Sequence, residues 1–313
     1  MQNFKSGTKK NSSQIDFSEY GLVIQGPLES IGRSGASAYI TLSDFYAKEN
    51  SPFDCSDYIK KYVKNYPQLK IVFATWESDK LPKFRRNMES NLNFKLISFT
   101  DSLDNMSFQG THFPNNKYKQ MFLTLQGAEY LSQIGIKYII KVRSDQLINI
   151  EDLILDFKKA KSLRSFQVMI PFGFPNLPDY IEDFFFVSTA EQTIHVGKKY
   201  MGSKELFESA HNDYFYAWAS DQFQAIPRPI IKLLRATPFL RKCYSNSWKK
   251  TFSPSSYRIL DGLFWRGEKF PAKIPKSNGG FFLDYNSQNE ESLYPKLKYR
   301  SLVRWLLTKL GRP

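Results

Sequence analysis

Cysteine is scarce in this 313-residue chain, and long apolar runs are absent. The two cysteines, Cys55 and Cys243, lack the close spacing of zinc ligands. We therefore expect neither a disulfide framework nor a structural zinc site, and a reducing cytoplasm fits. No stretch approaches the roughly 20 apolar residues that span a bilayer. Residues 1–14 are polar and lack the apolar core of a secretory signal, so we expect a cytoplasmic protein.

Acidic residues are scarce in the last quarter of the chain. Lys and Arg number 26 against 25 Asp and Glu over residues 1–227, but 18 against 5 over residues 228–313. The body is therefore nearly neutral, and almost all of the net charge of +14 lies in the C-terminal part. Such an asymmetry indicates a polyanionic partner, either an anionic membrane surface or nucleic acid.

This charge step divides the chain into three expected segments. Residues 1–18 are polar and predicted to be disordered, residues 19–227 form the folded domain, and residues 228–313 form a basic C-terminal helical extension. Within the extension, residues 296–310 predict an amphipathic helix with basic flanks, typical of a helix that lies in a membrane interface. The alternative is a helix packed on the core with solvated cations. No standard nucleic-acid-binding motif is present, so nucleic acid is the less favoured partner.

Apolar runs alternate with helical patterns along the body. The order of elements is β-α-β-β-α-β-α, followed by two further strands, and it predicts an α/β fold in which helices flank a mixed, mostly parallel sheet. Asn149 is the expected cap of the last helix. Strands are expected at residues 21–26, 70–76, 94–100, 138–143, 169–172 and 184–188, and helices at 36–48, 117–133 and 152–163.

One of these strands ends in a charged motif. Lys141, Arg143 and Asp145 have the same parity along the strand, so they are expected on one face at its carboxyl end. Ligands of open α/β sheets gather at such ends. Two cations and a carboxylate there suit a diphosphate with its Mg²⁺ or Mn²⁺. The alternative is an Arg–Asp ion pair that closes a strand without any function.

Two other strand ends and one helix start are candidates for the same ligand. Gly26, after Gln25, allows a close approach of the backbone, although Gly-Pro is also a common turn. Trp76, after Thr75, could stack on a nucleobase or simply fill the core. At the start of the long helix, Asn116 could cap the helix or, together with Gln120 in the same motif, belong to an anion site.

Acidic residues and a histidine later in the chain are candidates for proton transfer or metal binding. Glu182 and Asp183 precede an apolar strand and could bind acceptor hydroxyls or supply a general base. His211 could be a late metal ligand or a surface histidine. Asp221 could cap a helix or act as the base.

Taken in order, these motifs resemble the WavE lipopolysaccharide-synthesis family of bacterial glycosyltransferase-like proteins. The resemblance spans roughly residues 20–225. It implies a GT-A-like, Rossmann-like fold and sugar transfer from a nucleotide-sugar donor onto a lipopolysaccharide or capsular-polysaccharide precursor. The motifs that carry it are Val23–Pro27, Val72–Trp76, Asn116–Gln120 followed by Gly127, Lys141–Asp145 and Glu182–Phe185.

The resemblance implies a role for Asp145, and the roles of the other candidates are expected from the residues themselves. Asp145 stands where the GT-A metal-binding acid stands, with His211 as the second expected ligand of Mn²⁺ or Mg²⁺. Asp183 or Asp221 is the expected base. The nucleotide sugar is expected to contact Gln25, Gly26, Thr75, Trp76, Asn116, Gln120, Lys141, Arg143 and Ser144.

The chain departs from the general GT-A pattern at its metal motif. The usual Asp-x-Asp is reduced to Arg143-Ser144-Asp145, which leaves one carboxylate. Lys141 and Arg143 could then neutralise the leaving diphosphate themselves. We expect a glycosyltransferase on the cytoplasmic face of the inner membrane that acts on a lipid-linked acceptor. The alternative is a non-catalytic protein that binds a membrane or nucleic acid through its basic C-terminal region.

Overall fold

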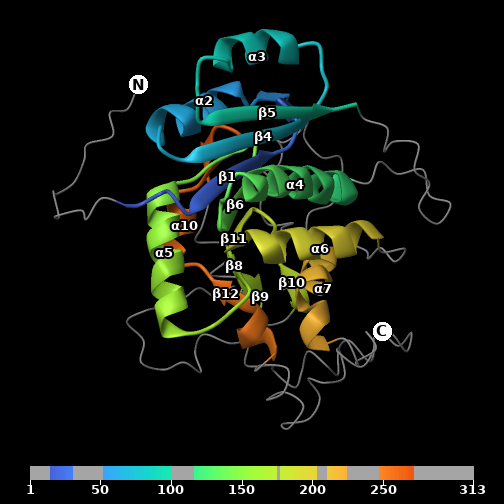
Figure 1. Ribbon diagram of the computed structural model, residues 1–313. Helices are drawn as coiled ribbons and strands as arrows, with labels where there is room; N and C mark the ends of the chain where they lie inside the picture. The colour runs from blue at the N-terminus through green and yellow to red at the C-terminus, as the bar shows by residue number, and fades with distance from the viewer. Residues whose placement is uncertain are drawn as a thin grey trace.

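A seven-stranded sheet forms the centre of the molecule in the computed structural model (Figure 1). The structure describes residues 15–30, 52–100, 116–174, 177–202, 210–223 and 247–270. The strand order is β12-β8-β11-β6-β1-β4-β5. These strands are β1 (Tyr20–Gln25), β4 (Lys70–Trp76), β5 (Phe94–Phe99), β6 (Tyr138–Arg143), β8 (Val168–Ile170), β11 (Phe185–Thr189) and β12 (Phe252–Pro254).

Only one strand of this sheet runs against the others. β11 pairs antiparallel with both β6 and β8, whereas every other neighbouring pair is parallel. The predicted α/β class with a mixed, mostly parallel sheet is therefore confirmed. Such a sheet needs cover on both faces, which explains why β1 is buried along its whole length.

Helices supply that cover on both faces. The α-helices α4 (Asn116–Gln133) and α6 (Ala190–Gly202) lie on one side of the sheet, and α5 (Ile150–Leu163) lies on the other (Figure 1). The alternation of side chains in β1 matches this layering. Leu22 and Ile24 belong to the larger core cluster, while Val23 belongs to a second cluster with Ala128 and Leu131 of α4.

The predicted strands are present, as are the helices expected at 117–133 and 152–163, and five described helices were missed. α5 begins where predicted, with the Asn149 side chain accepting a hydrogen bond from the backbone N–H of Asp152 at 3.2 Å. The missed helices are α2 (Ser56–Asn65), α3 (Leu81–Met88), α6 (Ala190–Gly202), α7 (Ala210–Phe223) and α10 (Tyr257–Asp261). The buried face of α2 consists of two tyrosines and one isoleucine, which a count of strictly apolar residues underestimates. The predicted helix at 36–48 lies outside the described residues.

Part of the basic C-terminal region is built into the body of the fold. β12 is the edge strand beside β8, and a short hairpin further along the chain pairs with β7 (Gln146–Leu147). The predicted helix at 296–310 lies outside the described residues. None of the helices in the described ranges has the length and apolar character needed to cross a bilayer.

The remaining described elements are strands of two to five residues and two helices, of which α7 has 14 residues. They are β2 (Glu29–Ser30), β3 (Phe53–Asp54), β7 (Gln146–Leu147), β9 (Gly173–Phe174), β10 (Leu177–Ile181), α7 (Ala210–Phe223), α10 (Tyr257–Asp261), β13 (Phe264–Trp265) and β14 (Glu268–Lys269).

Candidate functional site

The carboxyl ends of β4, β1 and β6 lie side by side at one edge of the sheet. From β1 the chain proceeds to β4 and β5 on one side, then crosses back to β6 on the other side of β1. This reversal is a topological switch point, where open α/β sheets form their ligand crevice. Gln25 and Thr75 therefore stand at the same edge as Arg143, as the strand pattern predicted.

A glycine closes the contact between the ends of β1 and β6. Gly26 has a φ of +129°, and a Cβ atom there would lie 2.6 Å from the Ser144 Oγ atom. Ser144 donates from its backbone N–H to the Gln25 carbonyl at 2.9 Å and from its hydroxyl to the Pro27 carbonyl at 2.8 Å. Only glycine combines this backbone conformation with so close an approach. Gly26 and Ser144 thus join the two strand ends.

Asp145 accepts hydrogen bonds from three side chains. Arg143 donates from Nε and Nη2 at 3.1 Å each, Trp265 donates from Nε1 at 3.0 Å, and the Ser30 hydroxyl donates at 3.3 Å. The residue is 3% exposed. Burial by itself would raise the pKa of Asp145, but the charge of Arg143 and the hydrogen bonds outweigh it and hold that pKa below its ordinary value. The carboxylate is therefore ionised and held in place.

The hydrogen bonds of Asp145 compete with a metal ion for its carboxylate oxygens. Both carboxylate oxygens already accept hydrogen bonds, and two of these bonds come from a guanidinium group. A cation there would have to displace Arg143 or lie beside its positive charge. The Arg–Asp pair that the sequence left as the alternative is thus present, on a central strand rather than at an edge. A metal at Asp145 stays a prediction.

Lys141 lies beneath the strand ends rather than on their surface. It is fully buried, and its Nζ donates to the backbone carbonyl of Asp183 and lies 5.5 Å from the centre of the Tyr214 ring. Burial lowers the pKa of Lys141 to about 8, and the nearby Arg143 charge adds to this, against the opposing charges of Asp183 and Asp145. In this position Lys141 is not exposed to solvent at the edge of the sheet, and its contact with a nucleotide sugar stays a prediction.

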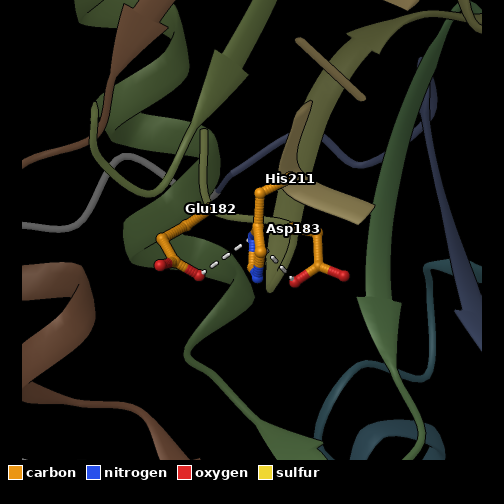
Figure 2. Close-up of side chains that lie close together, drawn as sticks. All are labelled: Glu182, Asp183 and His211. Carbon is orange, nitrogen blue, oxygen red and sulfur yellow. Dashed lines mark ion pairs between the residues drawn. The ribbon is translucent and has the colours of Figure 1, made fainter. Parts of the chain in front are cut away.

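Glu182, Asp183 and His211 form a compact cluster beside Lys141 (Figure 2). Glu182 and Asp183 precede β11, and because β11 is antiparallel, its first residues lie at the carboxyl edge of β6. His211 comes from the first turn of α7. Its Nδ1 lies 3.6 Å from Glu182 Oε2, 3.8 Å from Asp183 Oδ1 and 3.0 Å from the Ile181 carbonyl oxygen. The sequence grouped His211 with Asp145 as metal ligands, but its close neighbours are these two carboxylates.

An aromatic group stands at the end of β4. The Trp76 ring stacks on Phe122 of α4 with ring centres 5.7 Å apart, and Phe99 meets it edge-on at 6.3 Å. The Lys119 Nζ lies 5.8 Å from the centre of the Trp76 ring. Trp76 therefore fills part of the packing between β4, β5 and α4, as its alternative interpretation expected, and its side chain remains partly exposed.

Two amide oxygens near this edge are buried without a partner. Neither Gln25 Oε1 nor Gln120 Oε1 makes a hydrogen bond with any residue that the structure describes. Thr75 is fully buried at the end of β4. Asn116 begins α4, and Asp221 lies in α7, but their side chains lie outside what the structure describes.

Sequence reasoning missed two partners of the site. Ser30 and Trp265 both bond to Asp145, from positions more than a hundred residues away along the chain. Nothing in the pattern around either residue indicates this contact. It depends on the pairing of β13 with β7, which brings Trp265 beside the end of β6.

Comparison with known proteins yields likenesses at the level of structure alone. No family model and no curated protein matches the chain, so the resemblance to the WavE family stays a prediction. The synthase of 4-diphosphocytidyl-2C-methyl-D-erythritol from Anaerococcus prevotii is similar at a TM-score of 0.39 and 11% identity, over 64% of this chain and 84% of that one. A cytidylyltransferase from Leptospira borgpetersenii is similar at 0.38 and 11%, over 94% and 95%. Likenesses this weak do not bear on function.

Proposed function

We propose that this chain is a glycosyltransferase that moves a sugar from a nucleotide-sugar donor to a lipid-linked glycan. The observation that carries the proposal is the switch point between β1 and β6, with Gln25, Gly26 and Arg143 at its edge. Nucleotides bind at such points in doubly wound sheets. The proposal makes two statements: the chain is a transferase that uses a nucleotide donor, and the group that it transfers is a sugar.

Arg143 is the proposed contact to the donor diphosphate. Two of its nitrogens bind Asp145, but Nη1 makes no hydrogen bond with the described residues, and 19% of the side chain is exposed. A guanidinium that is fixed by one carboxylate and still has donors to offer suits a phosphate oxygen. In this proposal Asp145 orients Arg143, and the buried Lys141 contributes its charge from below rather than by contact.

The nucleoside is proposed to lie near the start of α4. Because α4 follows β5 and leads into β6, its first turn lies at the carboxyl edge of the strands, where its dipole favours an anion. The buried oxygens of Gln25 and Gln120 are acceptors for the N–H or O–H groups of a base or ribose. Trp76, with Thr75 and Asn116, completes the proposed binding surface.

Proton transfer from the acceptor hydroxyl is assigned to Asp183 or Asp221. Asp183 is buried beside Lys141, at the edge that the donor is proposed to occupy. A general base must reach the proton that it takes; Asp183 lies just before β11 at this edge, and Asp221 comes from α7. The basic region 228–313 is proposed to dock the enzyme on an anionic membrane surface, where a lipid-linked acceptor lies.

A thermal-shift panel tests the donor part of the proposal. We expect one of the UDP-, GDP-, CMP- or dTDP-linked sugars to raise the Tm of the full chain. Gln120→Ala should reduce that rise, whereas Gln133→Ala, at an exposed position of the same helix, should retain it. A rise with CTP and none with any nucleotide sugar would contradict sugar transfer, and no rise with any nucleotide would contradict both statements.

A further inference from the structure

Glu182 and Asp183 place two carboxylates side by side in the interior of the protein. Their side chains are only 1% and 2% exposed, and they are adjacent in sequence. Burying an ionised carboxylate is costly unless a cation or several hydrogen bonds compensate it. The nearest fixed cation described, Lys141, donates to the backbone of Asp183.

His211 Nδ1 lies within hydrogen-bonding distance of the Ile181 carbonyl oxygen but not of the two carboxylates. Its Nδ1 is 3.6 Å and 3.8 Å from the two carboxylate oxygens, longer than an N–H···O hydrogen bond. Ligand atoms that share a cation at about 2.1 Å lie about 3 to 3.5 Å from one another. The ligand atoms of all three side chains lie within 4.8 Å of one another, so small side-chain shifts would bring them to that spacing.

A fourth donor completes the set. The Ile181 carbonyl oxygen lies 3.0 Å from His211 Nδ1, a separation expected of two neighbouring ligands. The three side chains converge on one point in Figure 2, with the imidazole between the two carboxylates. The His211 side chain is 17% exposed, which leaves an approach from solvent on its side.

We propose that Glu182, Asp183 and His211, together with the Ile181 carbonyl, bind a divalent cation of the Mn²⁺ type. One imidazole with three oxygens suits Mn²⁺, which accepts both kinds of donor. The site is separate from Asp145, whose oxygens are held by Arg143, Ser30 and Trp265. It also holds whether or not the chain transfers a sugar. A cation on Asp183 removes that carboxylate from the role of base and leaves Asp221 for it.

A cation at this site would connect the segment that leads into β11 with the first turn of α7. Residues 181–183 lead into the one antiparallel strand of the sheet, and His211 lies in the first turn of α7. A bound cation would link these two segments and offset the two buried charges together. The competing explanation is that His211 hydrogen-bonds to the Ile181 carbonyl and lies beside the two carboxylates without any metal, and it predicts different behaviour in the same experiment.

Titration of the metal-stripped full chain with MnCl₂, without nucleotide, tests the proposal. Bound Mn²⁺ is followed by loss of the free-ion signal in electron paramagnetic resonance, and stability by Tm. We expect one Mn²⁺ per chain and a rise in Tm. Glu182→Gln and His211→Gln should weaken binding about tenfold or more. The control is His195→Gln, which removes an exposed histidine of α6.

The outcomes separate the two explanations. Circular dichroism confirms folding of each variant, and Glu182→Gln preserves shape while removing a buried charge. Mn²⁺ binding that survives in Glu182→Gln and His211→Gln would overturn the proposal. A wild type whose Tm does not change with Mn²⁺, while metal-free His211→Gln has a lower Tm, would also overturn it, because that is the behaviour expected of a cluster without a metal. Since no nucleotide is present, these results are independent of the donor panel.

Discussion

At the scale of single residues, Asp145 shows how one carboxylate can connect distant parts of a chain. Its partners Arg143, Ser30 and Trp265 come from β6, β2 and β13, and the backbone N–H of Arg266 donates to its carbonyl oxygen at 2.8 Å. Breaking a buried pair costs more than the pair contributes, because the remaining charge is left uncompensated. Asp145 is thus a structural anchor as well as a candidate site residue.

Replacing this carboxylate should cost stability. We expect Asp145→Asn to lower the free energy of unfolding by about 3 kcal/mol, because it leaves the Arg143 charge without its partner. Urea unfolding of the variant and the wild type measures the difference. Asp57→Asn, at an exposed position of α2, is the matched control and should change little. Equal stability of Asp145→Asn and wild type would contradict the anchoring role.

The buried Lys141 should make stability depend on pH. Its pKa is lowered to about 8 in the folded protein, mainly by burial, from an ordinary value of 10.5. Between these values the unfolded chain holds a proton that the folded protein has lost, so the free energy of unfolding rises with pH. Relative to Lys141→Met, the wild type should gain up to about 1.4 kcal/mol per pH unit over this range.

Urea unfolding at several pH values from about 7 to 10 checks this slope. Taking the difference between wild type and Lys141→Met cancels the tyrosines, several of which have a raised pKa from burial. Lys83→Met, at an exposed position of α3, is the control substitution. A flat difference across the range would mean that Lys141 is not buried as described.

At the scale of elements, the contact between β1 and α4 depends on a helical glycine. A Cβ atom on Gly127 would lie 2.6 Å from Val23 Cγ1 and 3.0 Å from its Cγ2. Val23 is fully buried in the central strand, so its close-packed side chain has no room to move away from an added Cβ atom. This contact sets how closely α4 approaches β1, and hence where the first turn of α4 stands relative to the strand ends.

Enlarging this glycine should force the two elements apart. We expect Gly127→Ala to lower the free energy of unfolding by about 1 to 3 kcal/mol, the usual cost of overpacking a core. Gly202→Ala, at the end of α6 where no atom lies within 4 Å of the new Cβ, should not destabilise. Combining Gly127→Ala with Val23→Ala should cost less than the sum of the two single changes, and strict additivity would contradict the steric explanation.

At the scale of the whole molecule, the neutral body and the basic C-terminal region overlap in structure. β12 extends the central sheet, and Trp265 reaches Asp145 from the same region. Removing everything after residue 227 would therefore remove part of the fold together with the charge. A chain that ends at residue 270 retains β12, β13 and β14 while losing the basic segment 271–313.

This shortened chain allows a clean test of membrane docking. We expect the full chain to bind vesicles that contain anionic lipid, with binding that weakens as salt rises, and the shortened chain to bind less. Co-sedimentation with vesicles measures both, and neutral vesicles are the control. Binding to an oligonucleotide that exceeds binding to vesicles, and is lost with the same segment, would favour the nucleic-acid alternative.

Much of the fold could be predicted from local patterns. The apolar runs of β1, β4, β5 and β6 identify buried parallel strands, and Asn149 identifies the start of α5. Among the helices that the sequence did not predict, α2 buries tyrosines, and α3 is short and highly charged, so neither has a clear apolar stripe. The sequence could also predict that the candidate residues at the strand ends lie at the same edge of the sheet, because the carboxyl ends of neighbouring parallel strands meet there.

What the sequence determines by itself is local: which segments form strands or helices, and where charge and carboxylates stand along them. What only the tertiary structure decides is which of these groups meet. His211 lies beside Glu182 and Asp183 because α7 packs near the strand that they precede, and Asp145 is bonded to Trp265 because β13 pairs with β7. Such contacts depend on packing between elements far apart in the chain, and local pattern carries no record of that packing.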